Sequence, residues 1–117
     1  MKSRVFLSVL LFAFVGTIWM ISCSKSSSNN NGGGGGTPTI TMRNMVFSNT
    51  NLTITAGTRV TWTNDDNMAH TVTSDNAIFN SGDMQAGTSF NFTFNTPGTY
   101  SYHCIYHSTM TAVIIVH

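Results

Sequence analysis

From residue 37 onward, apolar and polar residues alternate in short runs. Phe90, Phe92 and Phe94 alternate with polar residues, and so do Val60 and Trp62. Runs with a period of two, rich in β-branched and aromatic residues and separated by Gly, Pro and Asn, are typical of half-buried β-strands. The strands expected from this pattern cover residues 39–47, 52–55, 59–63, 71–73, 89–94, 99–104 and 111–116.

The same region shows no helical period, so the pattern predicts an all-β sandwich or barrel. The alternation also predicts which side chains form the core. This expected core set is Ile40, Leu52, Ile54, Val60, Trp62, Val72, Phe90, Phe92, Phe94, Tyr100, Tyr102, Val113 and Ile115.

The N-terminal residues 1–22 have a different pattern. Lys2 and Arg4 precede an apolar run over 5–21, and the run ends just before Cys23. A basic start followed by such a run is typical of an export signal. The end of the run resembles a bacterial lipobox, which implies cleavage before Cys23 and attachment of lipid to it. An uncleaved membrane helix is the alternative.

Residues 23–36 form a Ser-, Asn- and Gly-rich linker, a composition that stays flexible because it has no apolar area to bury. The expected organisation is therefore a signal peptide over 1–22, a lipidated cysteine and linker over 23–36, and one domain over 37–117. The expected location is the bacterial cell envelope, with the domain anchored to a membrane and facing the periplasm or the exterior.

Charge is sparse, and this limits the possible partners. Only 8% of the 117 residues are charged, and the net charge is +1. The expected domain carries two arginines against four aspartates, a net charge of −2. This balance argues against a nucleic-acid-binding surface.

The chemistry-bearing residues gather near the C-terminus. Cys104, His107 and Met110 lie within seven residues, and His70 lies upstream. One thiolate, two imidazoles and a weakly held thioether are the ligands of a mononuclear electron-transfer copper site. Cys23 has a separate explanation at the lipobox, so we do not expect a disulfide between the two cysteines.

Strand alternation separates two neighbouring residues of this cluster. Cys104 shares a face with the aromatic Tyr100 and Tyr102, so it should point inward, and His103 should point outward. Residues 105–110 are then expected to form a tight loop that presents His107 and Met110. A structural zinc site is disfavoured because Met is a poor zinc ligand. A second copper at His103 is disfavoured because His117 is the one histidine left to support it.

The spacing Cys-x2-His-x2-Met after Pro97–His103 resembles the cupredoxins of the plastocyanin and amicyanin group, and the short gap before Met110 is closest to amicyanin. The likeness extends to residues 56–64, 70–72 and 79–82. The resemblance implies a Greek-key β-sandwich of about seven to eight strands and one copper ion bound by a defined set of ligands. These ligands are His70, Cys104, His107 and Met110.

The resemblance also implies roles around the metal. Asn64 would tie the two ligand loops together, and the ring edge of His107 would be the electron port. The surrounding apolar docking patch would draw on Met68, Ala69, Ile105, Tyr106 and Met84. Tyr106 stands where this family often has proline.

The predicted function is therefore that of a type 1 copper electron carrier, not an enzyme. Its expected partners are redox proteins of the envelope, and the membrane through the lipid; we expect a monomer. A copper-binding module for storage, delivery or sensing is the alternative, because the same ligands could serve it.

Overall fold

The computed structural model describes residues 36–117; the expected signal segment, Cys23 and the linker up to residue 35 lie outside the described residues. Eight strands follow one another along this part of the chain. They are β1 (Thr39–Arg43), β2 (Val46–Phe47), β3 (Asn51–Ile54), β4 (Thr58–Asn64), β5 (Thr73–Ser74), β6 (Ser89–Phe94), β7 (Gly98–Cys104) and β8 (His107–Val116).

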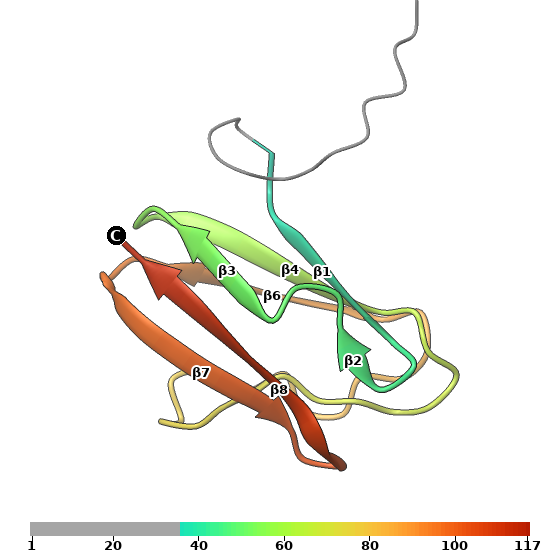
Figure 1. Cartoon of the computed structure of the whole chain (residues 1–117). Helices are drawn as coiled ribbons and strands as arrows, with labels where there is room; N and C mark the ends of the chain where they lie inside the picture. The colour runs from blue at the N-terminus through green and yellow to red at the C-terminus, as the bar shows by residue number, and fades with distance from the viewer. Residues whose placement is uncertain (1–35) are drawn as a thin grey trace, which may run out of the picture. The chain divides into compact units, whose positions relative to one another are not determined.

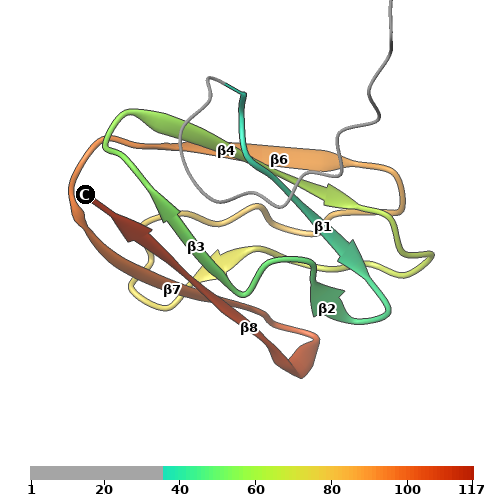
Figure 2. The same cartoon turned by 45° about the horizontal axis from the view of Figure 1, so that its top comes forward.

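The strands form two four-stranded sheets that face each other as a sandwich (Figures 1 and 2). One sheet has the order β2-β1-β4-β6 and the other the order β3-β8-β7-β5. Strand β1 runs parallel to β4 and β3 runs parallel to β8, and the other neighbours are antiparallel. Between residues 36 and 117 there is no helix, so the predicted all-β sandwich of seven to eight strands is confirmed. None of the described residues therefore belongs to a helix able to cross a membrane.

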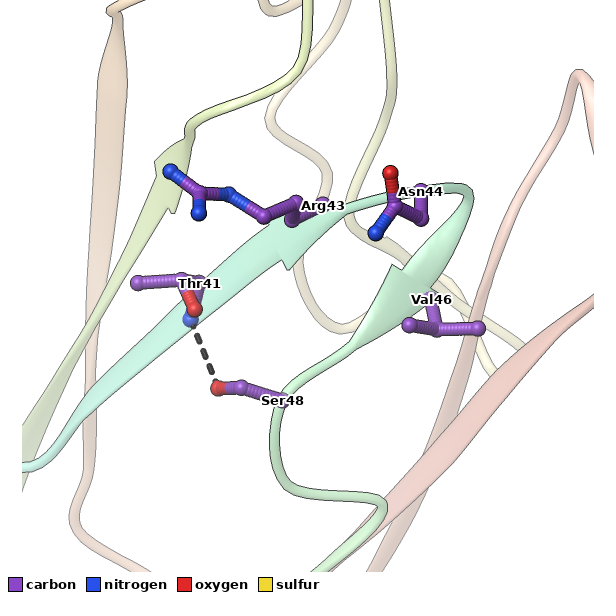
Figure 3. Close-up of a pocket in the computed structure, with 5 residues that line it drawn as sticks. All are labelled: Thr41, Arg43, Asn44, Val46 and Ser48. Carbon is purple, nitrogen blue, oxygen red and sulfur yellow. Dashed lines mark hydrogen bonds between the residues drawn. The ribbon is translucent and has the colours of Figure 1, made fainter.

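A tight turn interrupts the long first strand that the alternation predicted. Asn44 and Met45 both adopt positive φ angles, 53° and 59°, and this two-residue turn folds β2 back onto β1. At the open end of the hairpin, the Thr41 N–H donates to Ser48 Oγ at 2.9 Å, as Figure 3 shows. Asn tolerates this left-handed conformation, but a bulky Met rarely adopts it, so the pattern gave no signal for the turn.

The core joins the two sheets through aromatic side chains. Trp62 on β4 donates its indole N–H to the buried hydroxyl of Tyr102 on β7, at 3.2 Å. Burial raises the pKa of Tyr102 to about 12. Phe79, which lies outside the strands and was not predicted in the core, packs against both rings, with centroids 5.9 and 6.0 Å away. The other expected core residues upstream of β8 are buried or pack against the buried cluster.

The predicted orientation of the last strand is wrong. Val113 and Ile115 were expected in the core, yet Ile114 and Val116 are buried and the expected pair lies on the outer face, half-buried. The reason is that residues 112–116 are all apolar, so alternation carries no information there. Side chains two apart on a strand share a face, so the inward position of Met110 places Ile114 and Val116 inward as well.

This orientation of β8 leads to a direct test. Ile114→Ala should lower the free energy of unfolding of the metal-free domain by about 2–5 kcal/mol, because it opens a cavity between the sheets. Ile115→Ala should lower the free energy of unfolding clearly less, because that side chain is half-buried on the outer face. Denaturant unfolding of both variants measures the difference. Equal losses of unfolding free energy would contradict the assignment of Ile114 to the core and Ile115 to the outer face.

Candidate metal centre

His70 is held in place by backbone pairing rather than by the expected strand over 71–73. Its N–H donates to the carbonyl of Met84 at 3.1 Å, and the Met84 N–H donates back to the His70 carbonyl at 2.8 Å. Strand β5 begins only at Thr73. This isolated bridge fixes the backbone of His70 between two loops at one end of the sandwich.

Cys104 and His107 face each other across a sharp hairpin. β7 ends at Cys104 and β8 begins at His107, and the two are paired after an irregularity in the register at His103. The expected loop is therefore a two-residue turn, and both His107 and Met110 belong to β8. Placing these residues on strands gives them a firmer backbone than a loop would.

Three donor atoms converge at this end of the sandwich. Cys104 Sγ lies 3.8 Å from His70 Nδ1 and 3.5 Å from His107 Nδ1. The two Nδ1 atoms are 3.2 Å apart. Such separations fit three atoms that each bind one ion at about 2.0–2.3 Å. The three residues thus form a group that can hold a metal, as the sequence predicted.

Three of the four candidate ligands are buried and the fourth is half-buried. His70 is fully buried, and Cys104 and Met110 are each 1% exposed, whereas His107 is half-buried. Met110 follows His107 by three residues on β8 and lies on the inward face of that strand. A soft thiol and a thioether in a dry environment, with imidazoles beside the thiol, suit copper better than zinc.

The thiol of Cys104 is tied to the segment of His70 by Thr71. The Thr71 N–H donates to Cys104 Sγ at 3.3 Å. The Thr71 hydroxyl accepts the N–H of Ile105 at 3.0 Å. These two bonds join the two ligand-bearing segments, and sequence reasoning missed the residue that makes them.

The side chain of Asn64 bonds to different segments from those that the resemblance implied. Its buried side chain donates to the carbonyls of Met68 and Met84, both at 2.8 Å, and accepts the N–H of Asp66 at 2.9 Å. These bonds shape the loop that leads to His70 and attach it to the Met84 segment. They do not reach the turn between β7 and β8, so the expected tie between ligand loops falls to Thr71 instead.

Asp66 contacts His70, and sequence reasoning missed this residue too. Its Oδ2 lies 3.1 Å from His70 Nε2, and the same oxygen accepts the N–H of Met45 at 3.1 Å. The hydrogen bond with His70, followed by the one from the Met45 backbone, holds the pKa of Asp66 below its ordinary value.

The residues that flank His70 and His107 in the sequence are mostly apolar and accessible to solvent. Met68, Ile105 and Tyr106 are 41%, 57% and 50% exposed, and Ala69 is half-buried. Met84, which was also considered for this docking patch, is buried and belongs to the core. The Tyr106 hydroxyl donates to Asp83 at 2.5 Å, and this bond to a carboxylate raises the pKa of Tyr106.

His103 lies on the other face of β7, as alternation predicted. Its ring Nδ1 is 2.6 Å from Asp75 Oδ1, and both side chains are well exposed. The residue therefore belongs to the surface of the sheet and not to the cluster around Cys104.

Comparison with known proteins agrees with this geometry. The model of the cupredoxin-like domain family matches residues 10–116. Amicyanin-alpha from Methylorubrum extorquens is 30% identical over 87 residues, which cover 66% of this chain and 69% of that protein.

Solved structures with the same fold include a cupredoxin and an amicyanin. A purple cupredoxin from Nitrosopumilus maritimus is 32% identical, with a TM-score of 0.64, over 68% of this chain and 99% of that one. The reduced Cu(I) form of an amicyanin mutant is 28% identical, with a TM-score of 0.65, over 70% of this chain and 83% of that one.

Proposed function

Because this chain belongs to the cupredoxin-like family, we propose that it carries single electrons through a mononuclear type 1 copper site. Its cofactor is one copper ion. The observation that supports the proposal most strongly is the convergence of Cys104 Sγ with a ring nitrogen of His70 and of His107, all within 4.8 Å of one another. We propose Met110 as the weak fourth ligand.

The ligand types suit a carrier. Bound copper would supply a one-electron couple between Cu(II) and Cu(I). The soft thiolate of Cys104 can bind both Cu(I) and Cu(II), the imidazoles accept both states, and Met110 would be only a weak fourth ligand. Since His70, Cys104 and His107 are fixed by backbone pairing, they keep their positions when the charge changes.

The half-buried ring of His107 is the proposed electron port. The proposed docking patch consists of Met68, Ala69, Ile105 and Tyr106, which flank the two histidine ligands in the sequence and are exposed or half-buried. Apolar side chains shed water readily, so a redox protein can bring its own centre close to this ring. The proposed partners are electron donors and acceptors of the cell envelope, and the proposed role is that of a carrier rather than an enzyme.

The proposed setting rests on the N-terminal sequence alone. A lipid on Cys23 and a flexible linker over 24–36 would tether the domain to a membrane. Cys23→Ala should release the protein into the soluble fraction of lysed cells. Retention in the membrane fraction would favour an uncleaved apolar segment instead.

Delivery or storage of copper is the competing role, and the burial of Cys104 argues against it, because a donor must expose its thiol to the acceptor. The copper-loaded domain should therefore keep one copper through repeated cycles of oxidation and reduction, measured by metal content after gel filtration. Rapid loss of Cu(I) to a thiol-rich acceptor protein in the same assay would favour delivery.

A further inference from the structure

One carboxylate oxygen of Asp66 links the site to a strained turn on the surface. Oδ2 lies within 3.1 Å of His70 Nε2 and within 3.1 Å of the backbone nitrogen of Met45. The side chain of Asp66 is only 15% exposed, and His70 is fully buried. A single oxygen thus receives both contacts in a largely dry environment.

The contact with Asp66 determines which ring nitrogen of His70 carries the proton. An ionised carboxylate only accepts hydrogen bonds, so Nε2 must be the donor. In the neutral ring the other nitrogen, Nδ1, then has a free lone pair. That nitrogen is the one that faces Cys104 Sγ and His107 Nδ1.

The turn between β1 and β2 holds the carboxylate in position. Met45 adopts a φ of 59°, an unfavourable angle for a bulky residue, and its N–H points to Asp66 Oδ2. The hairpin is closed at its other end by the Thr41–Ser48 bond of Figure 3. The N–H of Asp66 is itself fixed by Asn64 Oδ1 at 2.9 Å, so both the backbone and the carboxylate of this residue are anchored.

We propose that Asp66 is a positioning residue that fixes the Nε2-protonated form of His70 and aims Nδ1 at the metal, and that the Asn44–Met45 turn holds Asp66 for this task. The inference rests on the proposed copper site. A carboxylate behind a metal-binding imidazole orients the ring and makes it a stronger donor, and losing such a partner typically lowers metal affinity by about 10- to 100-fold.

The first test uses the metal-free domain and does not depend on copper. Nitrogen-15 NMR of the histidine rings should place the His70 proton on Nε2. In Asp66→Ala the proton should shift in part to Nδ1, and in Asp66→Asn it should stay on Nε2, because the amide oxygen still accepts it. A proton on Nδ1 in the unmodified domain would overturn the proposal.

The second test measures Cu(II) affinity and the reduction potential. Asp66→Ala should bind Cu(II) about 10- to 100-fold more weakly and have a higher potential, because a negative charge that favours Cu(II) is lost. Asp66→Asn should recover much of the affinity and keep the raised potential. Asp65→Ala is the matched control, because it removes the same charge from the adjacent exposed residue. Equal effects in Asp65→Ala and Asp66→Ala would overturn the proposal.

A further pair of variants separates positioning from stability. Met45→Gly keeps the N–H but removes the strain of the turn, so it should leave the proton on Nε2. Combined with Asp66→Ala, it should restore thermal stability without restoring the tautomer or the potential. Recovery of all three would show that Asp66 only stabilises the fold. If the unmodified domain failed to bind copper, the proposed function would fail, whereas the tautomer measurement would still decide the role of Asp66.

Discussion

Replacing Cys104 by serine should give a folded domain that no longer turns blue with Cu(II). The thiol is 1% exposed and faces the ring nitrogens of His70 and His107. Cys104 is the only cysteine within residues 36–117, so no other thiolate there can replace it. A serine hydroxyl does not ionise near neutral pH and is a hard ligand, so copper affinity should fall by more than about 100-fold. Visible absorption and copper titration measure both effects.

The fold itself should survive this substitution. Serine is smaller but can still accept the N–H of Thr71, which now donates to the sulfur at 3.3 Å. Circular dichroism and denaturant unfolding of the metal-free variant provide the control. A Cys104→Ser domain that stays blue would show that the colour comes from another thiolate, and the assigned site would be wrong.

Met110→Leu should keep the blue colour and raise the reduction potential. Leucine has a similar volume, so the buried position should tolerate it at a cost of less than about 1.5 kcal/mol. The thioether should stabilise bound Cu(II) more than bound Cu(I), because three ligands are enough for Cu(I). Its loss therefore favours the reduced state. A 10- to 100-fold change in the affinity for Cu(I) relative to Cu(II) corresponds to a shift of about 60–120 mV in the potential of a one-electron couple.

Cyclic voltammetry of the loaded variant measures this shift, and Ile114→Val is a suitable control, because it changes a buried side chain further along β8. An unchanged potential in Met110→Leu would show that the sulfur of Met110 does not reach the metal. Loss of the colour would show that Met110 binds the copper more firmly than a weak fourth ligand should.

The sequence predicted most of the fold because alternation was clear where polar residues separate apolar ones. Phe94 and Trp62 were placed in the core correctly for this reason. Alternation failed on β8, whose last residues are all apolar. It also failed at Asn44 and Met45, where the turn depends on backbone angles that Met seldom adopts.

The types of ligand could be predicted, but their surroundings could not. The spacing of Cys104 and His107 already suggested a shared metal, and the structure brings His70 to them. Thr71 and Asp66 gave no such signal, because their roles depend on how loops pack. Thr71 reaches a sulfur 33 positions away in the chain, and no local pattern contains that contact.

The measurement that tests the copper site most directly is the spectrum of the purified domain with one equivalent of Cu(II). The geometry around Cys104 predicts an intense blue thiolate-to-copper absorption band and an EPR signal with narrow copper hyperfine splitting, both appearing in step with a single bound ion. A colourless adduct, or one with the wide hyperfine splitting of copper bound only by nitrogen and oxygen, would contradict it.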